Sequence, residues 1–200
     1  MSKVPSIYIS ALLLAAGEGE RMRGIKQLLP LGEKSMVEAS LDNLQASQVD
    51  EIIVVLGFAA ERILPLLKGK ERVKVVINPS FLGGMSTSMH YGLRVIDPQS
   101  KGVLIALADQ PFIPPEVVDL LIERFAEGSK GIVLPVYQGR RGHPVILDRE
   151  RYEGELFGLR GDVGGREIVK SHPEDVLEVE VFSSGVVLDI DDWEEYKEFT

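Results

Sequence analysis

Short apolar runs alternate with longer amphipathic segments from residue 7 to residue 137 of this chain. The apolar runs have the length of strands, and polar residues do not alternate within them, which is typical of strands buried on both faces. The segments between them carry apolar residues at helical spacing. This alternation predicts βαβ units and a parallel sheet. We expect strands at 7–16, 50–57, 72–79, 102–111 and 131–137, and helices at 35–47, 59–69, 88–96 and 114–128.

Two of the expected helices carry clear start signals. Ser35 with Glu38 three residues later forms a capping-box pattern at the start of 35–47. The segment 114–128 begins with two prolines and ends at Gly128, as helices often do.

The pattern changes after Tyr137. Residues 138–169 are charged, rich in glycine and less periodic. We expect this segment to fold over the edge of the sheet and to complete a site there. Residues 176–199 are expected to supply late strands and a terminal helix.

The first expected strand ends in a glycine-rich loop that carries several cations. The segment LAAGEGERMRGIKQLLPL covers residues 14–31 and contains Arg21, Arg23 and Lys26. Consecutive amides at a glycine turn can form an anion-binding nest, arginine can bind phosphate through two nitrogens, and lysine adds a compact charge. The loop is therefore either a cradle for an anionic ligand or a solvated loop in which Glu18 and Glu20 neutralise the cations.

This loop departs from two common nucleotide-binding patterns. A Walker A motif needs Ser or Thr after its lysine, whereas Gln27 follows Lys26. Gly17 and Gly19 match the first two glycines of the dinucleotide fingerprint, but Met22 stands at the third. The expected strand at 50–57 also ends in glycine instead of an acid, which argues against a dehydrogenase or flavodoxin-like domain.

Asp109 follows the apolar run of the expected strand at 102–111. Ligands of parallel sheets bind outside the carboxyl ends of the strands, so the loops after the strands should converge. Mg2+ prefers one or two carboxylates together with substrate phosphates, which suits Asp109, although Asp also commonly starts a turn before proline. Asp191 is a candidate second metal ligand, with Asp189 and Asp162 as alternatives, and Asp192 suits the cap of the last helix.

Three further motifs are polar and rich in small residues. GGMSTS places Ser86, Thr87 and Ser88 near an expected helix start, where they either face an anion or simply cap the helix. GRRGHP at 139–144 and RGDVGGRE at 160–167 are either hairpin turns or parts of a second surface for an anionic substrate.

These motifs together resemble a known family. The loop at 14–31 is similar to the signature loop of nucleotidyltransferases related to molybdenum cofactor biosynthesis, in which LAAG precedes Arg-Met-Gly, a lysine and Leu-Leu-Pro. NPSFLGGMSTSMHYGL, LADQP, GRRGHPVIL, GDVGGREIV and DIDDWEEY follow in the expected order and resemble the molybdenum cofactor cytidylyltransferase branch. Two motifs depart from the family: Arg23 stands where the loop has glycine, and DIDDWEEY lacks the usual Thr-Pro.

The resemblance implies an α/β, Rossmann-like, three-layer α/β/α nucleotide-diphospho-sugar transferase fold with a mostly parallel central sheet. It implies one nucleotidyltransferase domain over residues 1–200, with a nucleotide half at about 1–110 and an acceptor-facing part at about 111–200. The implied reaction is a Mg2+-dependent transfer of a nucleoside monophosphate from CTP, or another nucleoside triphosphate, to the phosphate of molybdopterin. Pyrophosphate is the implied leaving group.

The resemblance also implies roles for individual residues. Arg21, Lys26 and Asp109 would be catalytic, and Asp109 with Asp191 would hold the metal. The residues implied to bind the nucleotide are Leu14, Ala15, Ala16, Gly17, Gly19, Arg21, Lys26, Asn78, Ser86, Thr87, Ser88 and Asp109. Those implied to bind the acceptor are Gln110, Arg141, Gly142, His143, Pro144, Gly161, Asp162 and Gly165.

Composition limits the expected partners. The net charge of -9 over 200 residues disfavours nucleic acid and anionic membranes, and the absence of cysteine excludes disulfides and thiolate metal sites. Apolar runs stay shorter than the roughly 20 residues that span a bilayer. We therefore expect a cytoplasmic protein. The resemblance, and not the composition, implies that its substrates are a nucleoside triphosphate and a phosphorylated, pterin-like acceptor. The resemblance adds a molybdoenzyme or a cofactor-inserting chaperone as a protein partner.

Two alternatives stay open at this point. The chain is a cytidylyl- or guanylyltransferase for another phosphorylated acceptor, such as a sugar phosphate or an isoprenoid precursor. Otherwise it is a non-catalytic nucleotide- or cofactor-binding chaperone of a molybdoenzyme, in which Lys26, Asp109 and Asp191 would be dispensable. The residues do not decide which base is used, and CTP follows from the resemblance alone.

Overall fold

The computed structural model describes residues 7–19, 22 and 24–199. An eight-stranded sheet forms its centre, and a short hairpin lies beside it. The sheet strands are β1 (Ile9–Ala15), β4 (Glu51–Leu56), β5 (Val73–Ile77), β6 (Gly102–Leu107), β7 (Ile132–Tyr137), β8 (Arg140–Arg141), β9 (Val145–Asp148) and β10 (Val176–Glu180). The hairpin strands are β2 (Pro30–Leu31) and β3 (Lys34–Ser35).

The strand order is β10-β7-β9-β6-β1-β4-β5, with β8 paired to β7. Four neighbouring pairs are parallel, namely β1 with β4, β1 with β6, β4 with β5, and β7 with β10. Strand β9 is antiparallel to both of its neighbours. The expected mostly parallel sheet is confirmed, and the chain order reverses between β1 and β6.

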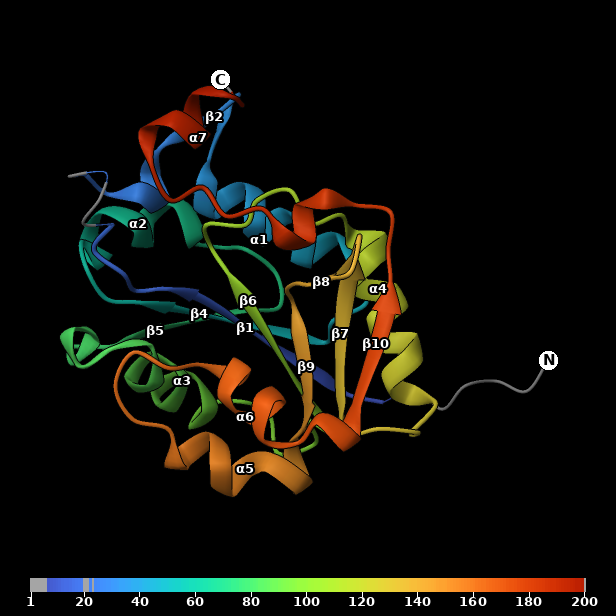
Figure 1. Ribbon diagram of the computed structural model, residues 1–200. Coiled ribbons are helices and arrows are strands. Elements are labelled where there is room, and N and C mark those ends of the chain that lie inside the picture. The colour runs from blue at the N-terminus through green and yellow to red at the C-terminus, as the bar shows by residue number, and fades with distance from the viewer. Residues whose placement is uncertain (1–6, 20–21, 23, 200) are drawn as a thin grey trace.

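Helices cover both faces of the sheet (Figure 1). One face carries α1 (Met36–Ala46), α2 (Ala60–Leu67) and α4 (Pro115–Ala126), and the other carries α3 (Met85–Leu93), α5 (Arg149–Gly158) and α6 (Gly165–Ser171). The short helix α7 (Trp193–Lys197) lies near the hairpin (Figure 1). This is the three-layer arrangement expected from the sequence. In the described part of the chain, every helix is too short or too polar to cross a membrane.

Strand β1 shows why the sheet is covered twice. Ala11, Leu13 and Ala15 pack into the core under α1, α2 and α4, whereas Leu12 and Leu14 pack into the core over α3, α5 and α6. Successive strand residues point to opposite faces, so a continuous apolar run serves both cores. Burying each of these leucines contributes roughly 1.5–3 kcal/mol to folding.

The segment after Tyr137 differs from the expectation. Residues Val145–Asp148 form β9, which lies between β6 and β7 inside the sheet, not over its edge. The expectation was wrong because a short apolar run lies hidden in a polar, glycine-rich stretch, and one of its two partners, β6, is distant in sequence. The glycine-rich segments therefore reach the strand ends from the middle of the sheet.

Several helix and strand limits can be compared with the sequence signals. The capping box of Ser35 and Glu38 is present at α1, and Pro115 begins α4 as expected. Neither Ser86 nor Ser88 caps α3, because its N-cap residue is Gly84. Only one of the late strands expected after residue 176 forms in the described residues, since Ser184–Val187 is a turn of 3-10 helix.

The last helix fastens the loop that follows β1. Met22 and Met36 pack with Ile190 and Tyr196 in a small third core. The indole nitrogen of Trp193 donates to the carbonyl of Met22 at 3.2 Å. The end of the chain thus fixes the position of the first loop.

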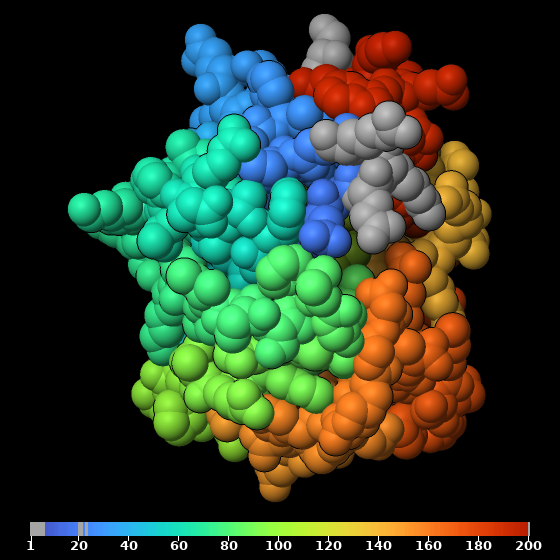
Figure 2. Space-filling model, turned by 90° about the vertical axis from the view of Figure 1, so that its left-hand side faces the viewer, coloured from blue at the N-terminus to red at the C-terminus, as the bar shows by residue number. Residues whose placement is uncertain are grey.

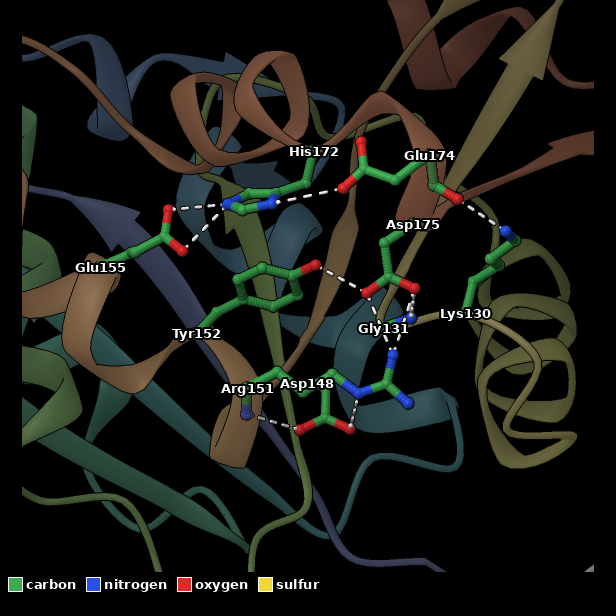
Figure 3. A network of polar contacts seen from close by, with 9 residues as sticks. All are labelled: Lys130, Gly131, Asp148, Arg151, Tyr152, Glu155, His172, Glu174 and Asp175. Carbon is green, nitrogen blue, oxygen red and sulfur yellow. Dashed lines mark hydrogen bonds and ion pairs between the residues drawn. The ribbon is translucent and has the colours of Figure 1, made fainter.

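A polar network joins the starts of β7 and β10 to α5 (Figure 3). Asp175 accepts hydrogen bonds from the Gly131 amide at 3.0 Å, the Tyr152 hydroxyl at 2.6 Å and the Arg151 guanidinium at 3.0 Å. Burial and the hydrogen bond to Asp175 raise the pKa of Tyr152, which keeps its hydroxyl a donor. The network lies at the end of the sheet away from the loops after β1 and β6, so it serves the fold.

Candidate active site

The loops after β1 and β6 meet where the strand order reverses. Open α/β sheets bind ligands at such a switch point, outside the carboxyl ends of the strands. The loop after β1 carries Lys26 and the loop after β6 carries Asp109, 83 residues later. The sequence argument that these loops converge is therefore supported by the register of the sheet.

Lys26 joins two carboxylates. Its Nζ donates to Asp109 Oδ2 at 2.9 Å and to Asp191 Oδ1 at 2.8 Å. The Lys26 side chain is 10% exposed, so this ammonium is largely removed from water. Burial alone would lower the pKa of Lys26, but the two carboxylates outweigh it and raise that pKa above its ordinary value. The ammonium therefore stays charged in the folded protein.

A cavity of about 360 Å³ opens beside this cluster. Apolar side chains and loop backbone form its walls, and Lys26, Asp109, Asp162 and Asp191 bring the charges. The expected nucleotide or metal residues that line it are Leu14, Ala16, Gly17, Gly19, Lys26, Ser88, Asp109 and Asp191. Leu14, Ala16 and Met36 line the cavity together with the Lys26 cation, which suits a ligand with both an apolar part and anionic groups.

The start of α3 and the loop at 160–163 close one side of this cavity. A Cβ atom added to Gly84 would lie 2.4 Å from the carbonyl carbon of Gly161, and the Ser86 amide donates to the Gly161 carbonyl at 3.2 Å. The Met85 amide also donates to Asp162 Oδ1 at 3.3 Å. Figure 2 shows these two segments, green and orange, side by side. Gly84 has φ 91, and only glycine permits both this conformation and this approach.

Asn78 supports this side from behind. It is fully buried, and its amide nitrogen donates to Thr87 Oγ1 at 2.9 Å and to Ser88 Oγ at 3.0 Å. Of these residues only Ser88 lines the cavity. Asn78, Ser86, Thr87 and Ala15 lie behind its wall, so their contribution is to hold the wall in place.

A second hollow of about 280 Å³ adjoins the first and shares Met85, Leu107, Asp109, Asp162 and Asp191 with it. His143 and Gly165 also line it, as do Arg166, Lys170 and Asp189. The two hollows thus meet at the carboxylates of Asp109 and Asp191.

Two groups in the second hollow have shifted acidities. Burial and the charges of Asp109 and Asp191 raise the pKa of Asp189, which Gln110 opposes by a hydrogen bond. Burial, followed by the charge of Arg166, lowers the pKa of His143 to about 4. His143 is therefore neutral at pH 7, and its Nδ1 is buried without a hydrogen-bond partner in the described structure.

Other expected site residues lie apart from the two hollows. The Arg141 guanidinium pairs with Glu178 at the surface. Gln110 and Pro144 line a separate, very small cavity. Gly142 packs against the backbone of Val186. Arg21, expected to be catalytic, lies outside the described residues.

Gln27 is a site residue that the sequence analysis did not select. It is 6% exposed and lines the larger cavity beside Lys26. The sequence carried one signal for Gln27: this polar residue stands between the loop lysine and the apolar Leu28. A purely solvated loop would expose its side chain.

The carboxylates fit a divalent cation that is shared with a substrate. Asp109 Oδ1 is buried and has no hydrogen-bond partner in the described structure, while Asp109 Oδ2 and Asp191 Oδ1 already face one positive charge. In the described ranges no three His, Cys, Asp or Glu side chains gather as a metal site. Two carboxylates with ligand phosphates completing the shell is the arrangement that Mg2+ favours.

A glycine-rich loop that carries cations and an acidic strand tip, both at the switch point of a parallel sheet, are typical of a nucleotide-binding protein. The comparison with protein families makes this specific: the chain belongs to the MobA-like NTP transferase domain family, whose model matches residues 11–176. The expected relationship to nucleotidyltransferases of molybdenum cofactor biosynthesis is thereby confirmed.

Curated relatives carry several different names. Nicotine blue oxidoreductase of Paenarthrobacter nicotinovorans is 28% identical over 173 residues, which cover 82% of this chain and 83% of that protein. Molybdenum cofactor cytidylyltransferase of Escherichia coli is 22% identical and covers 70% of each chain. The bifunctional protein GlmU of Symbiobacterium thermophilum is 34% identical over 123 residues, but these are 60% of this chain and only 26% of that protein.

Solved structures share the whole fold. Rv0371c of Mycobacterium tuberculosis superposes with a TM-score of 0.84 at 28% identity, covering 97% of this chain and 98% of that one. A complex of the same protein with manganese gives a TM-score of 0.80 at 28% identity and covers 98% of each chain. A divalent metal is thus part of a solved structure with this fold.

Proposed function

We propose that this protein transfers a nucleoside monophosphate from CTP to the phosphate of molybdopterin or the molybdenum cofactor, in a Mg2+-dependent reaction that releases pyrophosphate. The observation that carries this proposal is the buried Lys26 ammonium between Asp109 and Asp191, at the junction of two adjoining hollows. Two polyanions must meet in such a transfer, and a lysine and a cation at one point neutralise both.

The larger cavity would hold the nucleotide. The loop backbone at Leu14–Gly19 and Lys26 would receive the triphosphate, together with Arg21 of the undescribed part of that loop. The second hollow would hold the acceptor, where Arg166 and Lys170 supply positive charge and His143, Asp162 and Gly165 line the wall. In this assignment residues 1–110 supply most of the nucleotide cavity and later residues most of the acceptor hollow, while Met85, Leu107, Asp109, Asp162 and Asp191 line both.

The chemical step is an in-line displacement. An oxygen of the acceptor phosphate attacks the α-phosphorus, a new P–O bond forms, and the bond to the β-phosphate oxygen breaks as pyrophosphate leaves. A phosphate monoester is already anionic at neutral pH, so no protein base needs to remove a proton. Lys26 would stabilise charge that develops on the leaving pyrophosphate.

Asp109 and Asp191 would hold the Mg2+. When the cation is bound, it neutralises negative charge on the phosphates. The remaining work of the chain is positioning, because phosphoryl transfer of this kind depends on alignment and electrostatic stabilisation.

The proposed base and acceptor are inferred from the similarity of this chain to known nucleotidyltransferases. The motifs at 78–93, 139–147, 161–169 and 189–196 resemble the cytidylyltransferase branch, and the molybdenum cofactor cytidylyltransferase of Escherichia coli covers 70% of this chain. Relatives with other names, such as GlmU, leave open the alternative of another phosphorylated acceptor, for example a sugar phosphate.

The decisive experiment follows pyrophosphate release. Purified protein is incubated with Mg2+ and CTP, GTP or ATP, with and without a molybdopterin-type acceptor. We expect release with CTP that depends on the acceptor and is abolished in Asp109→Ala. Asp119→Ala is the matched control, because that carboxylate accepts a hydrogen bond from the Gln48 amide far from the cavity.

Each other outcome changes the proposal in a defined way. Release with another nucleotide would keep the reaction and change the base, and release with a sugar phosphate would change the acceptor. Nucleotide binding without any release would favour a non-catalytic chaperone of a molybdoenzyme. A redox reaction like that in the name of the Paenarthrobacter relative would also leave pyrophosphate unreleased.

A further inference from the structure

The side-chain amide of Gln27 links the 3-10 turn η2 (Lys26–Leu28) to the end of β1. Its Nε2 donates to the Ala15 carbonyl at 3.2 Å and to the Gly17 carbonyl at 2.8 Å. Ala15 ends β1, and Gly17 lies in the glycine loop that lines the larger cavity. The buried Gln27 amide thus donates hydrogen bonds to the loop on both sides of Ala16.

The orientation of this amide is determined by its surroundings. Two carbonyl oxygens can accept only from the NH2 group, so the reverse orientation would bring three oxygens together. In the orientation present, Gln27 Oε1 is buried and has no hydrogen-bond partner in the described structure. An unpaired buried acceptor is unfavourable, and such groups in native proteins often accompany a functional constraint.

The contacts have an electrostatic consequence for the cavity. Carbonyl oxygens that face a triphosphate would repel it, and Gln27 engages the carbonyls of Ala15 and Gly17. In a trans peptide the next N–H points the opposite way from the carbonyl, so the amides of Ala16 and Glu18 point away from Gln27. Neither the Ala16 nor the Glu18 N–H donates to the backbone carbonyl of another described residue. Unpaired amides in a glycine turn are the groups that receive anions.

The same turn also places Lys26. Lys26 reaches Asp109 and Asp191 while Gln27, its neighbour, reaches the loop carbonyls. The distance between the loop amides and the ammonium is therefore set within one short turn.

We propose that Gln27 is a positioning residue for nucleotide binding: its amide holds the Ala15 and Gly17 carbonyls so that the loop presents amides to a triphosphate. The inference deepens the proposed function and rests on the larger cavity being the nucleotide site. Gln27 should therefore affect binding of the polyphosphate part of the nucleotide and not binding of the nucleoside part.

The test measures binding of three probes to the folded protein by calorimetry: inorganic tripolyphosphate, CTP and cytidine. We expect Gln27→Met to bind tripolyphosphate and CTP about 10-fold more weakly, which corresponds to the loss of two neutral hydrogen bonds. Gln27→Glu places negative charge against both carbonyls, and we expect a loss of about 100-fold. Affinity for cytidine should be unchanged in both variants.

The control is Gln45→Met. Gln45 also donates its side-chain amide to a backbone carbonyl, that of Glu71 at 3.0 Å, but lies outside the cavity. The melting temperature of each variant is measured alongside, and Gln27→Met should melt close to the unchanged protein because it also removes an unpaired buried oxygen. In steady-state assays the KM for the nucleotide should rise while kcat changes little, a division that a general loss of structure would not produce.

Two results would overturn the inference. If Gln27→Met is folded and binds tripolyphosphate like the unchanged protein, Gln27 does not position the loop. If the loss is equal for tripolyphosphate and cytidine, or equal in Gln45→Met, the effect is structural and not specific to the anion. Failure of the unchanged protein to bind tripolyphosphate and CTP would instead reject the proposed nucleotide site itself.

Discussion

Lys26 holds together two carboxylates that lie 83 and 165 residues further along the chain. An ammonium in that position competes with any cation that Asp109 and Asp191 would bind. Nucleotide phosphates would draw the ammonium away, so metal and nucleotide should bind cooperatively.

Replacement of Lys26 by methionine tests this competition. We expect Lys26→Met to transfer nucleotide about 100- to 1000-fold more slowly, the usual effect of removing one stabilising donor. We also expect it to bind Mn2+ more tightly than the unchanged protein in the absence of nucleotide, as read by electron paramagnetic resonance. Lys34→Met is the control, because Lys34 pairs with Asp42 away from the site. Unchanged or weaker Mn2+ binding by Lys26→Met would reject the competition.

The lowered pKa of His143 predicts how the stability of the protein changes with pH. Its pKa is lowered to about 4 in the folded protein from an ordinary 6.5, so between these values the unfolded chain binds a proton and the folded chain does not. Above the ordinary pKa, His143 is neutral in both the folded and the unfolded chain, and the protein has its full stability. The free energy of unfolding should fall as the pH drops toward 4. The shift of 6.5 − 4 = 2.5 corresponds to about 3 kcal/mol at most.

Urea unfolding at about pH 7 and about pH 4.5 measures this contribution. His143→Gln should lose less stability than the unchanged protein between these pH values. His172 is the control with opposite sign, because its hydrogen bond to Glu155 raises its pKa (Figure 3). The stabilisation by His172 is present below about pH 6.5 and is lost as the pH rises through its folded pKa. Identical pH dependence in His143→Gln and the unchanged protein would contradict the assignment.

Between elements, the start of α3 approaches the loop at 160–163 so closely that a Cβ added to Gly84 would lie 2.4 Å from the carbonyl carbon of Gly161. We expect Gly84→Ala to push these segments apart and to weaken nucleotide binding by at least about 10-fold, since Met85 and Ser88 line the cavity. Stability should fall by about 1–3 kcal/mol. Chemical denaturation and calorimetry measure the two effects.

Gly69→Ala is the control, because it introduces backbone strain without a contact like that of Gly84 with Gly161. Gly69 has φ 78, similar to the φ 91 of Gly84, but an added Cβ would have no atom within 4 Å. Gly69→Ala should therefore cost only about 1–2 kcal/mol and leave nucleotide affinity unchanged. Equal effects of the two substitutions on affinity would show that the contact with Gly161 is unimportant.

The elements of the parallel sheet could be predicted because each strand carries its own signal. β1, β4 and β6 are continuous apolar runs, and helices of ordinary length separate most of them. β9 could not be predicted in its place, because four residues say little about their neighbours and the pairing with β6 is non-local. The convergence of Lys26 with Asp109 followed from the rule on strand ends, whereas the contacts of Gln27 depend on the local path of the loop.

At the scale of the whole molecule, the net charge of -9 opposes the approach of any nucleotide. Salt screens this repulsion beyond about 10 Å at 0.1 M, while contacts inside the cavity are screened less. We therefore expect the association rate constant of a fluorescent CTP analogue to rise several-fold between about 0.01 M and 0.15 M salt. Stopped-flow mixing at several salt concentrations measures it. A rate that falls with salt would mean that the cations of the first loop dominate the long-range field.

The separation of Lys26 from its two carboxylates has a consequence for synthesis of the protein in a cell. Ribosomes add about 5–20 residues per second, so the 165 residues between Lys26 and Asp191 take roughly 10–30 s to emerge. Asp109 is added about halfway through this interval, shortly after the residues of β1, β4, β5 and β6. The nascent chain can thus begin to fold long before it can carry out chemistry, and the site is completed only when the segment that bears Asp191 is made.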